Sequence, residues 1–331
     1  MRSVPMAVVT EAPITRNPAP GETERAYAIF QQPWWLDAVA PGHWGEVTCE
    51  HAGRVVARLP FVVRGRRRVR MLTQSSLTQT LGPWVEPSSA KPARALSRQH
   101  ELLADLEAQL PPAWAFSQQF SPAMLNALPF RWAGYHLEVR YTYRLDALDP
   151  TDTLWWGLRD NIRREIRKAR RRVEVVADLG VDRFHDVLSR TYARQHLPTP
   201  HSVDKLGRLE AACAARGAGS MLFARDEAGR IHAVAWVVWD VQGAFYLLAG
   251  ADPHLRTSGA SSLLAWEALT RAREHTDVFD FRGSMLRPVE RFFRGFGARQ
   301  TPYLSVTRMK PPVRAVLAAR SGLQHIKART R

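Results

Sequence analysis

The strongest constraint on the fold is a run of three strands that leads directly into a glycine-containing loop and a helix. Residues 221–252 consist of apolar runs joined by two tight turns, which predicts three strands. Residues 254–303 then predict a loop, a long helix, a strand, a Gly-Ser turn, a second helix and a closing Phe-Gly turn. Strands and helices in this order predict an α+β unit.

The loop before the long helix has the composition of a phosphate-binding helix start. A glycine lets an anion approach the backbone, the first N–H groups of a helix attract negative charge, and a nearby arginine neutralises it. The predicted contacts to a phosphorylated donor are Arg256, Ser258, Gly259, Ala260 and Ser261. The alternative is a plain helix cap, because many helices begin with Ser-Gly.

Candidate catalytic side chains follow this loop in the sequence. Alternation along the next strand places Asp280 and Arg282 on one face. We expect Asp280 to act as a base or an orienting carboxylate, and the alternative is a salt bridge to an arginine. Ser284 lies in the glycine turn after the strand. Arg294 is a candidate for contacting a phosphate or an oxyanion, and its alternative is a solvated position near a helix end.

A strongly basic helix provides a candidate surface for a polyanion. The chain has 47 Lys and Arg against 31 Asp and Glu, a net charge of +16. Such an excess favours RNA, DNA, an acidic membrane surface or a phosphorylated cofactor, and the alternative is an arginine-rich protein with solvated faces. One helix is predicted over 154–172, with a polar side that is almost wholly cationic. Its polyanion candidates are Arg159, Arg163, Arg164, Arg167, Lys168 and Arg171.

Aromatic and polar side chains elsewhere are candidates for lining a substrate cleft. They are Trp34, Trp35, Gln79, Gln118, Arg194 and Arg282. For the tryptophans the alternative is a place in the core. The sequence contains no metal-ligand cluster, no P-loop and no Gly-x-Ser-x-Gly motif. We therefore expect no metal and no tightly bound cofactor.

Length and composition predict the domain organisation. A chain of 331 residues favours two domains. We expect a loose leader over 1–24, a first domain over 25–150, a second, donor-binding domain over 151–310, and a basic tail over 311–331. The tail either contacts a nucleic acid or a membrane, or it packs on the body as a helix or forms a frayed end. Two cysteines and no apolar run of about 20 residues favour a cytoplasmic location.

Three segments together resemble the FemAB-like branch of the GNAT acyltransferase superfamily. They are the helix and strand that begin at Asn161, the stretch over 248–267, and the stretch from Asp280 through Phe292 and Gly297 to Tyr303. The similarity covers most of 25–308 and is sharpest beyond residue 150. It implies two GNAT-like domains, each with a mixed, mostly antiparallel sheet flanked by helices.

The resemblance also implies amide formation, in which an amine attacks an activated acyl group. Some members of the family use aminoacyl-tRNA and others use acyl-CoA. The tRNA-using type carries Phe-Lys before the last Phe-Gly turn, whereas this chain has Phe292-Phe293 followed by Arg294. The basic helix favours aminoacyl-tRNA, and the loop at Arg256 favours CoA.

We therefore expect an N-acyltransferase that acts on a small-molecule or peptide amine. Aminoacyl-tRNA is the preferred donor and acyl-CoA is the alternative. Two further hypotheses are a non-catalytic protein that binds nucleic acid on a degenerate acyltransferase fold, and a polyanion-binding partner at a membrane surface. The oligomeric state stays open.

Overall fold

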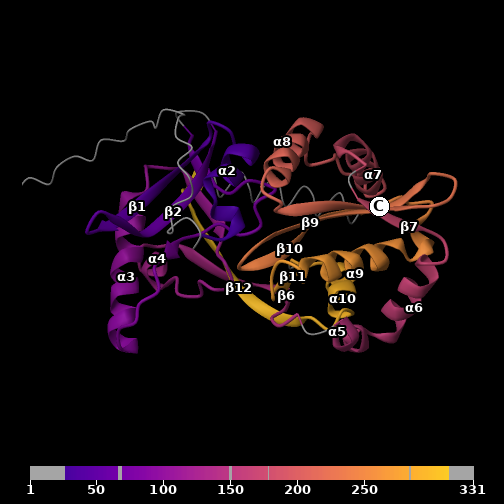
Figure 1. Cartoon of the computed structure of the whole chain (residues 1–331). Helices are drawn as coiled ribbons and strands as arrows, with labels where there is room; N and C mark the ends of the chain where they lie inside the picture. Colours follow the sequence, from indigo (N-terminus) through magenta and orange to yellow (C-terminus); the bar gives the residue numbers. More distant parts are fainter. Residues whose placement is uncertain (1–26, 66–68, 149–150, 178, 283–284, 313–331) are drawn as a thin grey trace, which may run out of the picture.

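The computed structural model describes residues 27–65, 69–148, 151–177, 179–282 and 285–312, and it joins them into a twelve-stranded sheet flanked by helices (Figure 1). The strand order is β1-β2-β3-β5-β12-β6-β11-β10-β9-β8-β7, with β4 paired to β2. Most strand pairs are antiparallel, which confirms the predicted α+β class. The predicted leader and nearly all of the predicted tail lie outside the described residues.

The strands are β1 (Trp44–His51), β2 (Arg54–Arg64), β3 (Met71–Thr73), β4 (Trp84–Val85), β5 (Ala115–Gln119), β6 (His136–Leu145), β7 (Glu174–Ala177), β8 (Gly219–Arg225), β9 (Ile231–Asp240), β10 (Gly243–Ala251), β11 (Phe279–Asp280) and β12 (Arg299–Met309). The helical elements are η1 (Ile29–Gln31), α2 (Pro33–Val39), α3 (Pro92–Gln109), α4 (Leu128–Trp132), α5 (Thr151–Gly157), α6 (Asp160–Ala169), α7 (Val181–Ala193), α8 (Val203–Ala214), η2 (Arg256–Ser258), α9 (Ala260–Ala272) and α10 (Arg287–Arg294).

Helices cover both faces of the sheet in the C-terminal half. Along β9, alternate side chains point to opposite faces, as in any strand. Ala233, Ala235 and Val237 pack in the core that contains α9, while Val234 and Trp236 pack in the core that contains α7 and α8. Because both faces are covered, β9 is a nearly continuous apolar run rather than a strictly alternating one.

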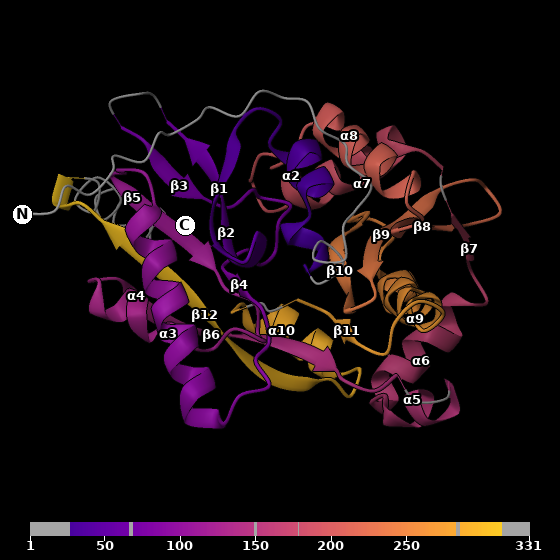
Figure 2. The same cartoon turned by 60° about the vertical axis from the view of Figure 1, so that its left-hand side comes forward.

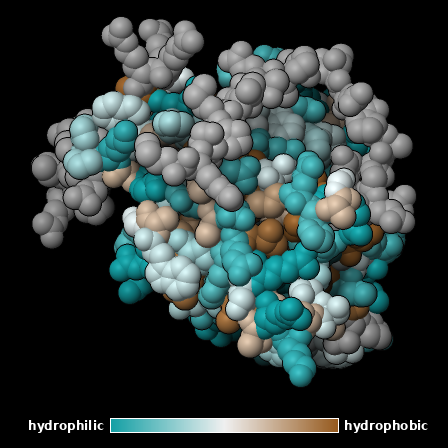
Figure 3. Space-filling view, turned by 90° about the vertical axis from the view of Figure 1, so that its left-hand side faces the viewer, coloured by the Kyte–Doolittle hydropathy of each residue, from teal (hydrophilic) through white to brown (hydrophobic). Residues whose placement is uncertain are grey.

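The N-terminal half has a separate core beneath α3 and α4. Leu103 and Leu106 of α3 are fully buried and pack in one cluster with Leu59 of β2 and Phe116 of β5. Figure 2 shows α3 and α4 together at this end of the sheet. The outer face is mostly hydrophilic, with small apolar areas between the polar side chains (Figure 3).

The last strand of the chain joins the two halves. β12 pairs with β6 along most of its length and with β5 at its C-terminal end. β6 in turn pairs with β11, so a strand from the first half lies directly beside the strand that carries Asp280. Pairing across the predicted boundary at residue 150 brings residues from both halves to one place.

The prediction of one helix over 154–172 is wrong. The structure has α5 and α6, with Arg159 in an extended conformation between them (φ −63°, ψ 148°). The Arg159 N–H donates to the carbonyl of Gly295 at 2.9 Å, and Ile162 packs so closely on Gly295 that a β-carbon there would lie 2.8 Å from Cγ1 of Ile162. A contact with the end of α10 therefore interrupts the helix.

None of the helices in the described ranges is long and apolar enough to cross a lipid bilayer.

Candidate active site

A cavity of about 100 Å³ lies where the two halves of the sheet meet. Its walls come from β6, β10, β11 and β12 and from two loops of the N-terminal half. The lining residues are Ala28, Gln79, Thr80, Gln119, Ser121, Pro122, Ala123, Thr142, Arg144, Gln242, Phe245, Val278, Asp280, Arg282 and Tyr303. This volume is large enough for a small polar group together with the atoms next to it.

A wider hollow of about 390 Å³ lies between α7, the β8–β9 turn and the loop after β10. Its charged groups largely neutralise one another. Arg190 binds both Asp186 and Asp252, at 2.7 and 2.8 Å. We therefore take the smaller cavity as the candidate active site.

Two parallel strands diverge at the wall of the smaller cavity. β10 pairs with β11 only at Ala244 and Phe245, although β10 continues to Ala251. A bulge between Tyr246 and Leu248 shifts the register of β10 against β9 at the same point. Beyond Phe245, the second edge of β10 therefore has no strand partner among the described residues. The side chain of Gln79 approaches this edge and donates to the carbonyl of Tyr246 at 3.4 Å.

Asp280 is the buried carboxylate of the cavity. The hydroxyl of Thr142 and the backbone N–H of Arg282 both donate to Oδ1, the latter at 2.8 Å. Burial raises the pKa of Asp280, while these hydrogen bonds and the charges of Arg144 and Arg282 oppose the rise. No ion pair forms at Asp280 among the described residues, so the predicted alternative of a salt bridge does not describe its geometry.

The backbone of Arg282 is held in an unusual conformation. Its φ is +62°, which is uncommon for a residue other than glycine. The hydrogen bond from its N–H to Asp280 closes a turn that stabilises this conformation. Burial lowers the pKa of the guanidinium to about 10, against the opposing charge of Asp280.

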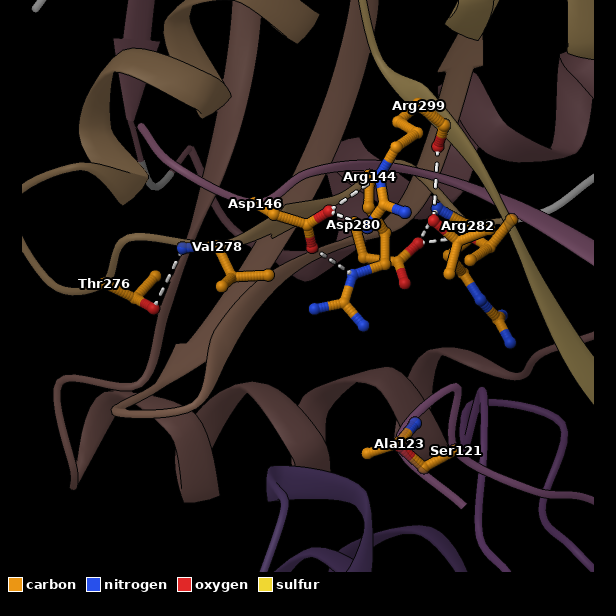
Figure 4. A network of polar contacts seen from close by, with 11 residues as sticks. Ser121, Ala123, Arg144, Asp146, Thr276, Val278, Asp280, Arg282 and Arg299 are labelled. Carbon is orange, nitrogen blue, oxygen red and sulfur yellow. Dashed lines mark hydrogen bonds and ion pairs between the residues drawn. The ribbon is translucent and has the colours of Figure 1, made fainter. Parts of the chain in front are cut away.

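Figure 4 shows how the charged side chains near the cavity divide into two groups. Arg144 and Arg299 both bind Asp146, through Nε at 3.2 and 3.1 Å. Arg282 lies beside Asp280, with its side chain apart from that group (Figure 4). The predicted juxtaposition of Asp280 and Arg282 is therefore present, although β11 ends at Asp280 and does not include Arg282.

A second polar cluster joins the two halves of the chain, and the sequence did not reveal it. Nζ of Lys205 donates to Ser75 at 2.9 Å and to Ser76 at 3.2 Å, and Nδ1 of His201 lies 3.3 Å from the Ser76 hydroxyl. Burial and the charges of Arg64 and Arg208 together lower the pKa of Lys205 to about 8. Burial and the neighbouring cations Lys205 and His185 likewise lower the pKa of His201 to about 4. We call these four side chains the Lys205 cluster.

The predicted phosphate loop is closed on one side by α6. Gly259 has φ +86°, and a β-carbon on it would overlap the carbonyl oxygen of Glu165 and lie 3.0 Å from the Glu165 carboxylate. Ser258, Gly259 and Ala260 are buried, Ser261 is half-buried and Arg256 is exposed. The Ser258 hydroxyl accepts the N–H of Ala260 at 3.3 Å. Gly259 is thus required for a positive φ and for close packing of α6.

The basic residues of α6 are not equivalent. Arg163 donates to the carbonyl of Trp156 at 3.1 Å, pairs with Asp160 and stacks on the Trp156 ring, so it ties α5 to α6. Lys168 lies 3.8 Å from Glu165. The remaining candidates are exposed, and they are Arg159, Arg164, Arg167 and Arg171.

The predicted substrate residues separate into two sets. Gln79 and Arg282 line the cavity. Trp35 is fully buried in the core. The Gln118 amide is held at both ends by the backbone, because its Nε2 donates to the Pro60 carbonyl at 2.8 Å and its Oε1 accepts from the Gly82 N–H at 3.0 Å. Trp34 packs at the edge of that core, with Arg216 over its ring, and Arg194 is exposed at the end of α7.

Two predicted catalytic residues are not placed at the cavity. Ser284 lies outside the described residues. Arg294 is half exposed on α10 and binds Glu290 at 2.8 Å, and Glu290 also accepts a hydrogen bond from Tyr143 at 2.9 Å. Phe293, at the position of the family lysine, is buried against Tyr246 and Phe281. Residues missed by sequence reasoning include Thr142, Arg144 and Tyr303, all of which line the cavity.

Comparisons with known proteins give one family match and several structures of similar fold. Residues 157–294 match the family model described as an acetyltransferase (GNAT) domain. The structure resembles that of FemX, with a TM-score of 0.64, 12% identity, and coverage of 85% of this chain and 94% of FemX. No match is found among curated proteins.

Two further solved structures are similar at a TM-score of 0.52. One is the C-terminal domain of a putative lysylphosphatidylglycerol synthetase from Agrobacterium fabrum, at 14% identity, covering 91% of this chain and 96% of that one. The other is a tandem GNAT protein from the clavulanic acid biosynthesis pathway, at 13% identity, covering 83% and 86%. At such identities these are likenesses of fold.

Residues 157–294 are thus similar to a GNAT acetyltransferase domain, and the chain as a whole shares the fold of FemX and of a tandem GNAT protein. The predicted resemblance to the FemAB-like branch of the GNAT superfamily is borne out as a likeness of fold. A GNAT domain implies an acyl donor and an amine acceptor as partners.

Proposed function

We propose that this protein transfers an aminoacyl group from aminoacyl-tRNA to an amine held in the cavity around Asp280. The observation that carries the choice of donor is the packing of α6 on the loop at Gly259. The Glu165 carbonyl lies against Gly259 on the side where a β-carbon would stand, and the Glu165 carboxylate adds negative charge beside the loop, which disfavours a CoA pyrophosphate there. A phosphate at a helix start needs open space and no opposing charge.

The exposed face of α6 supports a polyanionic donor. Arg164, Arg167 and Arg171 are spaced three and four residues apart, so they follow one side of the helix and the turn after it. None of the three is in an ion pair within the part of the chain that the structure describes. Unpaired arginines of this kind gain affinity for a nucleic acid through release of its counterions.

The chemistry requires few side chains, because an aminoacyl ester is already activated. The amine nitrogen attacks the acyl carbon, a C–N bond forms and the ester C–O bond breaks. Asp280 takes the proton that the amine loses and returns it to the leaving tRNA hydroxyl. Its raised pKa makes Asp280 a stronger base than an exposed carboxylate. The unpaired edge of β10 supplies backbone N–H groups for the oxyanion.

The Lys205 cluster supports an acceptor with an anionic part. Lys205 is partly buried, and the charged groups that shift its pKa are both cations, Arg64 and Arg208. Ser75 and Ser76 precede the cavity residues Gln79 and Thr80 in the same loop. An anionic extension of the acceptor would relieve the repulsion among these cations.

Acyl-CoA is the second candidate donor. The match to an acetyltransferase domain favours it, because the matched range includes the whole predicted phosphate loop. Under this alternative, α6 has to move away from Gly259 before the donor binds. Acetyl-CoA would then raise the melting temperature by mass action.

Charge reversal on α6 tests the proposal. The triple variant Arg164→Glu, Arg167→Glu, Arg171→Glu should raise KM for charged tRNA at least about 10-fold, because phosphate contacts are lost. The KM for the amine should stay unchanged. The matched control is Arg94→Glu, Arg131→Glu, Arg183→Glu, which makes the same charge change at exposed positions elsewhere. Equal KM values for tRNA in the two triple variants would contradict the proposed surface.

A further inference from the structure

We infer that the amine acceptor also carries a carboxylate, which Arg282 binds while Asp280 faces the amine. This inference rests on the proposed function, since it assigns a substrate class to the same cavity. An amino acid or a peptide with a nearby free carboxylate has the required chemistry.

Arg282 has no partner for its charge in an ion pair among the described residues. Its guanidinium lines the cavity, and burial lowers its pKa to about 10, so it remains charged at neutral pH. Among the described residues it forms no ion pair, whereas Arg144 and Arg299 nearby are both bound to Asp146. A partly buried cation without a partner is costly unless a ligand supplies the counter-charge.

The backbone at Arg282 is strained. A non-glycine residue with φ +62° is less stable than one in the helical or extended regions. Such strain persists where surrounding structure enforces it, and it concentrates at ligand sites. The hydrogen bond from the Arg282 N–H to Asp280 is the enforcing contact. The Asp280 side chain is thus one charged group of the cavity, and it also holds the backbone that carries the other, the Arg282 guanidinium.

Asp280 and Arg282 both line the cavity but do not form an ion pair with each other. Each shifts the pKa of the other through its charge, but no ion pair joins the two side chains. Both therefore face the cavity with charge available to a ligand. A molecule with an amine and a carboxylate offers one group to each.

Size and charge favour a carboxylate over a phosphate. The cavity of about 100 Å³ holds a carboxylate and the carbons beside it. One guanidinium matches a single negative charge with two parallel hydrogen bonds. A dianionic phosphate at the same place would be repelled by Asp280.

Binding of matched ligand pairs tests the inference without any donor. Each of a panel of free amino acids and free-acid dipeptides is compared with its primary amide by calorimetry. For the wild type, we expect the best acid to bind about 10- to 100-fold more tightly than its amide, the range for a lost hydrogen bond to a charged group. In Arg282→Gln this ratio should fall to about one, and in the control Arg131→Gln, at an exposed position of α4, it should stay at the wild-type value.

Four results would overturn the inference. Three are equal binding of every acid and its amide, a preference for the acid that survives in Arg282→Gln, and tighter binding of O-phosphoethanolamine than of any acid. The fourth is that the wild-type protein binds no member of the panel. Failure of the proposed function is distinguishable from failure of this inference. If only the proposed function fails, the protein binds acids in preference to their amides but forms no amide product. Amide formation on simple amines, with no effect of a carboxylate, would leave the proposed function standing and reject this inference.

Discussion

Asp280→Asn should lower kcat/KM for amide formation by about 100- to 10,000-fold, the usual contribution of a positioned base. The side chain keeps its shape, and its amide oxygen still accepts from Thr142 and from the Arg282 N–H. The variant should therefore fold normally. The loss of activity would then reflect the missing proton acceptor rather than a collapsed cavity.

Stability provides the check on that interpretation. The folded pKa of Asp280 is raised above its ordinary value of 3.8, so the protonated form is favoured in the folded state. Its stabilising contribution is present below pH 3.8 and is lost as the pH rises through the folded pKa. Asp280→Asn should thus be at least as stable as the wild type at pH 7, with any gain fading at acidic pH.

Rate and melting measurements across pH decide between the two explanations. The wild-type kcat/KM should rise with pH through a step above the ordinary carboxyl range, and the step should be absent in Asp280→Asn. Asp277→Asn, at an exposed carboxylate in the same segment, is the control and should behave as the wild type. An Asp280→Asn enzyme with near wild-type turnover would show that Asp280 does not accept the proton.

Gly259→Ala should lower the free energy of unfolding by about 3 to 4 kcal/mol, from left-handed backbone strain and overpacking together. The residue has φ +86°, and a β-carbon would overlap the carbonyl of Glu165. That oxygen belongs to the backbone of α6, so it cannot move without shifting the helix. Chemical denaturation of the purified variant measures the change.

Gly134→Ala is the matched control for this substitution. Gly134 has φ +85°, but nothing lies within 4 Å of the position of its β-carbon. It should therefore lose only the backbone contribution, about 1 to 2 kcal/mol. If the two variants lose equal stability, α6 does not pack on the loop as described, and the argument against a CoA pyrophosphate at Gly259 fails with it.

Local sequence patterns were sufficient for much of the fold. Apolar runs joined by two tight turns, followed by a glycine before Ala260, predicted β8, β9, β10 and α9 close to where they lie. These elements are long and rich in apolar residues, and they pack in two cores that also take in Trp35 and Tyr143 of the N-terminal half. The helix predicted over 154–172 failed because Arg159 bonds Gly295, a contact that no local pattern encodes.

The candidate site was harder to predict because it is assembled from distant segments. Asp280 and Arg282 were identified from alternation along one strand. Thr142 reaches Asp280 only because β6 pairs with β11, and Tyr303 joins them because β12 returns to β6. Nothing in the sequence around Thr142 indicates that pairing.

The role of Gly259 shows a different limit of sequence reasoning. A glycine at a helix start predicts equally well a bound phosphate or a close contact with protein. The structure places α6 against it. Likewise, Lys205 meets Ser75 and Ser76 across the two halves, and their separation of about 130 positions hides the Lys205 cluster.

The most direct test of the proposed function supplies the wild-type protein with two labelled donors side by side. One is tRNA charged with a mixture of labelled amino acids, and the other is labelled acetyl-CoA. Each is incubated with the amino acid and dipeptide panel. We expect labelled amide from charged tRNA, blocked by excess uncharged tRNA, and none from acetyl-CoA. Labelled amide from acetyl-CoA alone would contradict the proposed function.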